Sequence, residues 1–327
     1  MIDFDYSRAT SLDEAAAQSR HPGAMLIAGG TTLIDLAKCG VAEPRTVVDI
    51  TRLPDLSAVT VDEAGATIGA LATMSRVAAD AGIEARFPAV SEALLLAASA
   101  QLRNMATIGG NLLQRTRCSY FRDPAGYAAC NKREPGSGCA ALENVTRDHA
   151  ILGTSDQCIA LYPGDLAVAL TALGATIRTT KREIAITDFF LEPGETPDRE
   201  TVLEPGEVVT AVHVPASKAA TNSTYLKVRD RASYEFAAAS AAVGLELEAD
   251  GRTIRDIRVA LGGVGTTPWR AEAVEAALTG RALDEARVRE AARFAVEGAK
   301  SWAGNAYKIE LAPRVVARAI LKVGGIQ

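Results

Sequence analysis

MLIAGGTTLIDLAK, residues 25–38, passes from a short apolar run through two glycines into a helical pattern. The apolar run Met25–Ala28 is typical of a buried strand, and Leu33–Lys38 has helical spacing. Gly29-Gly30 suits a tight turn between them, because glycine adopts backbone conformations that other residues avoid. With another strand expected at Thr46–Ile50, this stretch predicts a small α/β unit over residues 1–55.

A second Gly-Gly pair occurs in TIGGN, residues 107–111, and predicts another tight turn. Backbone N–H groups at a glycine turn that opens a helix favour an anion. Thr31 and Thr32 add hydroxyl donors at the first turn, so the two loops together suit a pyrophosphate held from both sides. Neither loop matches GxGxxG or GxxxxGK(S/T), which excludes the Rossmann and P-loop motifs. For either loop alone, an ordinary tight turn is the alternative.

Four of the five cysteines, Cys118, Cys130, Cys139 and Cys158, fall in one segment with the spacing C-x11-C-x8-C-x18-C. The segment, about 115–160, is rich in Gly, Arg, Asn and Pro and lacks periodicity, as functional or disordered insertions do. The spacing has none of the CxxC pairs of zinc ribbons or bacterial ferredoxins. Zinc, an iron–sulfur cluster and four unrelated thiols therefore all remain open.

Composition limits the function classes. The 327 residues are 48% hydrophobic and 23% charged, which is ordinary for a globular protein of two domains. The net charge of −5 offers no basic surplus for nucleic acid. The N-terminus lacks the apolar core of a signal peptide, and no apolar run is long enough to span a bilayer. We therefore expect synthesis in the cytoplasm and no membrane insertion.

The rest of the chain predicts an α+β protein. A hairpin is expected over 58–70, a buried helix over 89–100, and a further helix after Gly164-Asp165. The small, polar stretch 214–222 is the expected domain boundary. Strands followed by helices, the last two over 286–301 and 312–322, predict a small α+β domain beyond it. The expected domains are 1–215, divided into 1–55 and 56–215, and 222–325.

Four motifs in this order resemble the FAD-binding subunit of the molybdenum hydroxylases, the xanthine dehydrogenase and carbon-monoxide dehydrogenase medium-subunit family. They are AGGTTLIDL, ATIGGN, GDLAVALTALGA and YLKVRDRASYEFAAAS. The resemblance covers essentially the whole chain. It implies a two-subdomain FAD-binding domain of the PCMH/VAO type, followed by a domain like the C-terminal domain of CO dehydrogenase flavoprotein.

The cysteine segment departs from most of that family, in which the GGN motif and the next helix's aspartate lie close together. The pattern C…YFRD…CNKR…PGSGC…C resembles an insertion in a subset, the bacterial periplasmic-type aldehyde oxidoreductase FAD subunits. In that subset the insertion binds a 4Fe–4S cluster. The resemblance implies Cys118, Cys130, Cys139 and Cys158 as ligands and leaves out Cys39, which is expected to be a small buried thiol.

The resemblance also implies roles for other residues. Asp165 is expected to hydrogen-bond the cofactor, with a plain helix cap as the alternative. Lys227 is expected beside the flavin, where a cation stabilises the anionic reduced form, with a surface lysine as the alternative. His149 and His213 are expected to be structural. The residues expected around the FAD pyrophosphate are Leu26, Ile27, Ala28, Gly29, Gly30, Thr31, Thr32 and Leu33 from the first loop, and Thr107, Gly110 and Asn111 from the second.

Five basic residues flank the cysteines: Arg115, Arg117, Arg122, Lys132 and Arg133. They can offset cluster charge, form a solvated loop face, or dock a partner, and the residues alone do not choose among these.

The family's division of labour implies an electron-transfer subunit that works with a large molybdopterin subunit and a small 2Fe–2S subunit. The insertion-bearing subset implies an aldehyde substrate for the whole complex, with NAD, a ferredoxin, a quinone or oxygen as acceptor. Export to the periplasm would then require a signal on a partner subunit. Two alternatives stay open: a stand-alone flavin oxidase or dehydrogenase, and a flavoprotein with a structural four-cysteine zinc site.

Overall fold

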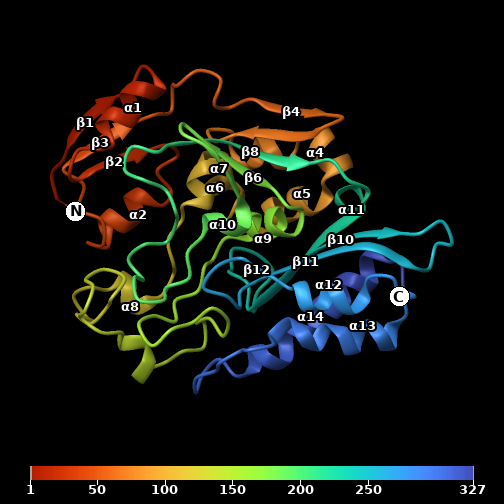
Figure 1. Cartoon of the computed structure of the whole chain (residues 1–327). Coiled ribbons are helices and arrows are strands. Elements are labelled where there is room, and N and C mark those ends of the chain that lie inside the picture. Colours follow the sequence, from red (N-terminus) through yellow and green to blue (C-terminus); the bar gives the residue numbers. More distant parts are fainter. Residues whose placement is uncertain (1, 327) are drawn as a thin grey trace.

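The computed structural model describes residues 2–326, in which three β-sheets are surrounded by mostly short helices (Figure 1). The first sheet is parallel and has the order β1 (Asp5–Arg8), β3 (Thr46–Asp49), β2 (Ala24–Ile27). Two helices belong to this unit, α1 (Leu12–Gln18) and α2 (Leu33–Lys38). The strand–glycine–helix order expected for 25–38 is confirmed, with β2 leading into α2.

Helix α1 begins where the sequence places a capping box. The Ser11 hydroxyl accepts the Glu14 N–H at 3.1 Å, and the Glu14 carboxylate accepts the Thr10 N–H at 2.7 Å. The reciprocal bond thus reaches one residue further back than in the usual capping box.

The second sheet is antiparallel and has five strands. Its order is β4 (Val59–Asp62), β5 (Gly65–Gly69), β8 (Val209–Pro215), β6 (Thr176–Thr179), β7 (Glu183–Ala185). The expected hairpin at 58–70 is β4–β5. The central strand β8 was not anticipated from the sequence, although Val212 is fully buried between Ile68 and Ile177.

Helices pack on this sheet around α9, which is buried along its whole length. An all-round apolar surface is what such a central helix requires. The expected helix over 89–100 is wrong in its end: α5 stops at Leu96, Ala98 takes φ +48, and Ser99 caps a new helix. The helices of this part are α3 (Met74–Ala78), α4 (Ala81–Arg86), α5 (Pro88–Leu96), α6 (Ala100–Met105), α7 (Ile108–Leu112), α9 (Asp165–Ala172), α10 (Ile186–Phe189) and α11 (Lys218–Thr221).

The third sheet is antiparallel and carries its helices on the face away from α9. Because side chains alternate along a strand, Ala242 faces the core of α9 while Ala241 and Val243 pack with the C-terminal helices. The strand order is β12 (Trp269–Arg270), β11 (Ile254–Gly262), β10 (Ala239–Leu247), β9 (Ser223–Val228). The helices are α12 (Glu272–Leu278), α13 (Glu285–Ala291), the 3-10 helix η2 (Ala292–Val296) and α14 (Tyr307–Val323).

Two helix boundaries in this part were predicted wrongly. The expected helix 312–322 begins earlier, because α14 starts at Tyr307. The expected helix 286–301 is α13 followed by η2, and it ends at Val296 because Gly298 takes φ +75 in a turn.

The cysteine segment, 113–164, is largely irregular, as its lack of periodicity predicts. It contains only α8 (Ser119–Arg122) and η1 (Ala140–Glu143), and in Figure 1 it forms the yellow-green loops below α2.

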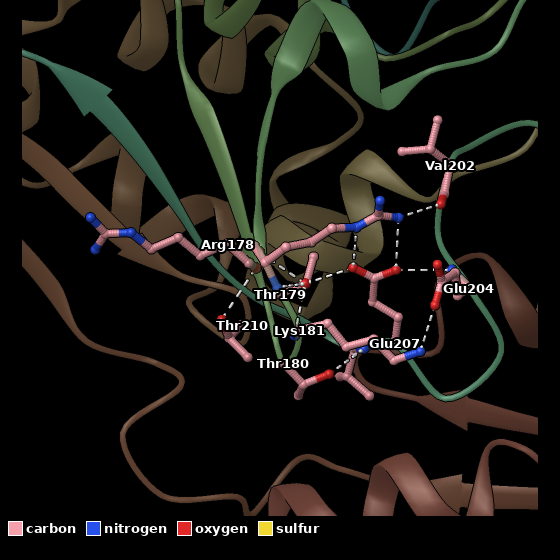
Figure 2. A network of polar contacts seen from close by, with 10 residues as sticks. Arg178, Thr179, Thr180, Lys181, Val202, Glu204, Glu207 and Thr210 are labelled. Carbon is pink, nitrogen blue, oxygen red and sulfur yellow. Dashed lines mark hydrogen bonds and ion pairs between the residues drawn. The ribbon is translucent and has the colours of Figure 1, made fainter.

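A buried carboxylate anchors the loop that leads into β8. Figure 2 shows Glu207 beside Thr179, whose hydroxyl donates to the carboxylate. Arg182, on the same β6–β7 hairpin, also donates to it. The Glu207 side chain is fully buried, and it also accepts the N–H of Glu204 at 3.0 Å. Although burial opposes ionisation, these hydrogen bonds lower the pKa of Glu207 to about 2.

We predict that Glu207→Gln lowers the free energy of unfolding by about 1–3 kcal/mol at pH 7, because charge-assisted hydrogen bonds are lost. A lowered folded pKa stabilises above the unfolded pKa, so the wild-type advantage should fade between about pH 4.3 and pH 2. Denaturant unfolding across this range measures both effects. Glu204→Gln is the control, because its exposed ion pair with Lys181 contributes little. Equal losses in the two variants would contradict the assignment.

Candidate functional site

A cleft of about 300 Å³ lies between the first and second sheets. The whole predicted stretch Leu26–Leu33 lines it, together with Thr107 and Gly110 from the second predicted loop. Of the predicted cofactor residues, Asn111, Asp165 and Lys227 do not line it. The remaining wall residues are Met25, Leu36, Val41, Ala42, Ile50, Ala70, Leu71, Gly109, Leu113, Arg115, Glu207, Val208 and Val209.

Gly29 brings the two loops together. A Cβ on Gly29 would lie 1.9 Å from the backbone oxygen of Met105, just before the second loop, so no larger residue fits without moving backbone. Gly30 takes φ +71, the left-handed conformation that glycine favours. Within residues 2–326, the N–H groups of Gly29 to Thr32 donate to no backbone acceptor, and these residues all line the cleft. The first loop therefore offers free amide donors at the cleft wall.

The second loop is not the tight turn that was predicted. Residues Ile108–Leu112 form helix α7, with Thr107 as its cap. Gly109 donates its N–H to Ala70 at 2.8 Å, and Gly110 donates to the Thr107 hydroxyl at 3.3 Å. The turn prediction failed because the capping hydroxyl and the neighbouring backbone absorb these donors.

Asn111 keeps one polar atom free. Its Oδ1 is buried and has no hydrogen-bond partner in the described residues, while its Nδ2 contacts the Met74 sulfur at 3.5 Å. A buried, unpartnered oxygen is costly unless a further group supplies a donor.

Asp165, at the start of α9, and Lys227, on β9, form a buried ion pair. Lys227 Nζ lies 2.8 Å from Asp165 Oδ2 and also donates to the Leu96 carbonyl at 3.2 Å, and its side chain is 1% exposed. Tyr225 donates its hydroxyl proton to the same carboxylate. Burial raises the pKa of Asp165, and Lys227 opposes that rise. The pair joins the start of α9 to strand β9; the flavin role expected for Lys227 stays a prediction.

The wall residues that were not singled out from the sequence as cleft residues include Glu207, Val208, Val209 and Arg115. The first three enter the cleft on β8 and the loop before it, and no local motif marks them. Arg115 lies over the Phe121 ring at 4.6 Å and pairs with Glu200. It also lines a neighbouring cavity that contains Cys158.

The four predicted cysteines gather, although they span 40 residues of chain. Cys130 and Cys139 are paired across an isolated antiparallel bridge. Cys118 packs against two apolar clusters, one that contains Cys130 and one against which Cys139 also packs. Burial raises the pKa of Cys118 to about 12 and that of Cys158 to about 11, and it also raises the pKa of Cys139. The nearby Cys130 charge adds to each rise.

Backbone N–H groups point at these sulfurs. The Ala160 N–H donates to Cys158 Sγ at 3.4 Å. The backbone amides of Tyr120 and Phe121 lower the pKa of Cys118 against the effect of burial, and those of Ala141, Leu142 and Ile159 do the same for Cys139. A lower thiol pKa favours the thiolate, which is the form that ligates metals.

Helix α2 is the shared wall between the cleft and the cysteine segment. Leu36 and Ala42 line the cleft and also pack in one apolar cluster with Phe121 and Cys130. The two sites are therefore separated by a single layer of side chains.

The five basic residues near the cysteines do not form a solvated face. Arg117 and Arg122 both pair with Asp35 of α2, while Arg115 and Lys132 both pair with Glu200. Arg133 donates to four backbone carbonyls of residues 120–128. The Lys132 charge lowers the pKa of Cys158 against the effect of burial. These residues fasten the segment, and one of them lies near a cysteine.

His149 was expected to be structural, but its Nε2 lies 3.3 Å from Cys118 Sγ. No spacing in the sequence links the two residues. Burial and, to a smaller extent, the charge of Lys308 lower the pKa of His149 to about 4.

Within residues 2–326, no group of three or more His, Cys, Asp or Glu side chains is placed so that it could hold a metal ion. None of the described helices has the length and apolarity needed to cross a membrane.

Comparison with known proteins assigns the chain to a family. A model for the FAD binding domain in molybdopterin dehydrogenase matches residues 2–217, and one for the CO dehydrogenase flavoprotein C-terminal domain matches residues 223–323. The chain belongs to the FAD-binding subunits of the molybdopterin dehydrogenases. The predicted family and the α+β fold class are confirmed, and this FAD-binding subunit is an oxidoreductase subunit.

Several relatives are similar over most of their length. The aldehyde oxidoreductase FAD-binding subunit PaoB of Escherichia coli (strain K12) is 45% identical, over 85% of this chain and 87% of its own. The glyceraldehyde dehydrogenase medium chain of Sulfolobus acidocaldarius is 30% identical, over 89% and 86%. The carbon monoxide dehydrogenase of Hydrogenophaga pseudoflava superposes with a TM-score of 0.76 at 27% identity, over 99% of each chain.

The cleft residues fit FAD. The first loop supplies free N–H donors where a phosphate needs them, and Gly29 keeps the two backbone segments close.

We predict that Gly29→Ala lowers the FAD content of the purified protein, because the new methyl group pushes the Met105 backbone away from the first loop. Overpacking should also cost about 1–3 kcal/mol of unfolding free energy. Flavin absorbance per protein and thermal unfolding measure the two effects. Gly251→Ala, at an exposed turn with no atom within 4 Å of the added methyl, controls for general glycine strain. Full FAD content in Gly29→Ala would overturn the assigned loop contact.

We predict that Lys227→Met destabilises the protein by about 3–5 kcal/mol, because it leaves the buried Asp165 carboxylate unpaired. The double variant with Asp165→Asn should lose less. Lys218→Met, which breaks an exposed pair, should have little effect. Unfolding experiments test the pair. Additive losses, or an unchanged stability with an altered flavin potential, would instead favour a direct flavin role for Lys227.

Proposed function

We propose that this chain is the FAD-containing electron-transfer subunit of a heteromeric aldehyde oxidoreductase. Family membership supplies the FAD site, and the names of two relatives, an aldehyde oxidoreductase subunit and a glyceraldehyde dehydrogenase chain, support the substrate class. The observation that carries the proposal furthest is the group of four cysteines lying behind helix α2, one layer of side chains from the FAD cleft.

In this proposal FAD accepts electrons from partner subunits and passes them to an external acceptor. The amides of Gly29 to Thr32 bind the pyrophosphate, and Thr107 and Gly110 approach it from α7. Asn111 supplies an acceptor oxygen for a cofactor donor. The apolar wall formed by Leu36 and Val41 excludes water from the side that faces the cysteines.

Cys118, Cys130, Cys139 and Cys158 would hold a 4Fe–4S cluster, which when bound supplies a one-electron carrier. Three observations favour a cluster: four thiols that lie near one another, the Ala160 N–H that donates to Cys158 Sγ, and the Lys132 charge near Cys158. Hydrogen bonds and positive charge at the sulfurs are the means by which proteins adjust cluster potentials. An all-thiolate zinc site uses the same ligand set, so metal analysis has to distinguish the two.

The relatives' names describe each of them as a subunit or a medium chain. These names support partner subunits for this chain. We propose that a molybdopterin subunit oxidises the substrate and that a 2Fe–2S subunit relays electrons to this chain. The stand-alone oxidase alternative lacks support from any residue, because no free acid–base group lines the cleft: Glu207 and Arg115 are both held in ion pairs.

We predict that Cys130→Ser, purified anaerobically, loses iron, sulfide and the EPR signal of the dithionite-reduced protein while it retains FAD. Cys39→Ser is the matched control, because Cys39 ends helix α2 outside the cysteine group. It is half-buried there, not fully buried as expected.

Metal analysis of the wild-type protein decides the case even if Cys130→Ser does not fold. Stoichiometric zinc without iron and sulfide would overturn the cluster proposal. Aldehyde turnover by the isolated chain would overturn the electron-transfer role.

A further inference from the structure

His149 is buried beside a proposed cluster ligand. Its Nε2 lies 3.3 Å from Cys118 Sγ, and the side chain belongs to a residue that is only 5% exposed. The sequence contains three histidines. In residues 2–326 the His213 ring contacts Thr67, and His21 lies in an exposed turn, so His149 is the one whose ring contacts a cysteine.

The surroundings of the ring select one tautomer. His149 Nδ1 is buried and has no partner in the described residues, so a proton there would be an unsatisfied donor. A proton on Nε2 instead points at the sulfur of Cys118. A sulfur that ligates iron has lost its own proton and can only accept, so the N–H···S direction is the one that satisfies both atoms.

Residues of the cysteine segment and of the C-terminal part hold His149 in place. The His149 N–H donates to Thr146 at 2.9 Å, and the ring lies against Tyr120 with centroids 5.7 Å apart. From the C-terminal part, Asn305, fully buried, donates to the Ala150 carbonyl at 3.1 Å and to the His149 carbonyl at 3.4 Å. Gly304 donates its N–H to the Thr146 hydroxyl at 3.0 Å. The backbone that carries His149 is therefore fixed, and Tyr120 packs against the ring itself.

We propose that His149 is a positioning residue for the iron–sulfur cluster, which donates Nε2–H to the Cys118 thiolate and thereby raises the cluster's reduction potential. The physical reason is that a hydrogen bond to a ligating sulfur stabilises the more negative, reduced cluster more than the oxidised one. This inference rests on the proposed function, because it requires that Cys118 ligate a cluster.

The first test uses the wild-type protein labelled with 15N-histidine. Pulsed EPR of the dithionite-reduced cluster should detect coupling to a 15N nucleus, because only one of the three histidines contacts a ligand. The coupling should disappear in His149→Leu and persist in His21→Leu, a histidine-to-leucine control far from the cysteines. Absence of coupling in the labelled wild-type protein would overturn the inference.

The second test is a redox titration of the cluster followed by EPR. His149→Leu removes the donor and should lower the ratio of reduced to oxidised cluster at a fixed potential by on the order of tenfold, which is about 59 mV for a one-electron couple. His149→Gln retains an N–H donor and should recover part of the shift. The flavin potential should be unchanged in both variants. An unchanged cluster potential in His149→Leu would overturn the inference.

Iron and sulfide content separates the two proposals. If the wild-type protein holds no cluster, the proposed function fails and this inference fails with it. If the cluster is present but shows no 15N coupling, only the role of His149 fails. If His149→Leu does not retain its cluster, the coupling in the labelled wild-type protein decides alone.

Discussion

The close approach of two backbone segments at Gly29 is the constraint on which the flavin site depends. A single methyl group there would collide with the Met105 carbonyl. The first loop can therefore lie against the second only if residue 29 is glycine. This contact brings a parallel sheet and an antiparallel sheet, formed by distant parts of the chain, to the two sides of one cleft. The amides of the first loop remain free because neighbouring helix α2 begins beyond them and does not use them.

Ion pairs then attach the cysteine segment to this frame. Asp35 on α2 binds two arginines of the segment, and Glu200 binds an arginine and a lysine on its other side. Each carboxylate pairs with two cations, so the segment is fastened near the cysteines. Since residues of α2 also line the cleft, a movement of the cysteine segment would displace that wall of the cleft. The C-terminal part adds a third support, because Asn305 donates hydrogen bonds to the backbone carbonyls of His149 and Ala150.

Whether a prediction succeeded depended on how far apart in the chain the interacting residues lie. Local signals predicted well: the strand–glycine–helix unit at 25–38, the hairpin at 58–70 and the cap at Ser11 all depend on neighbours in the chain. The predictions that failed depended on contacts from elsewhere. TIGGN became a helix because Ala70 takes the Gly109 N–H, and β8 is a central strand whose buried partners, Ile68 and Ile177, lie far away in the chain.

The family and the first loop of the cleft could be predicted from linear motifs, because glycines and their order are properties of the chain. The cysteine ligands were predicted from the same kind of motif and stay a prediction. Which groups meet is a property of packing, and no spacing encodes it. The resemblance places Lys227 beside a flavin, which stays a prediction, and only the fold shows that its charge is paired with Asp165, since a buried ammonium needs a counter-charge. The same reasoning explains His149: its partner Cys118 lies 31 residues away, and only the folded segment brings imidazole and sulfur within 3.3 Å.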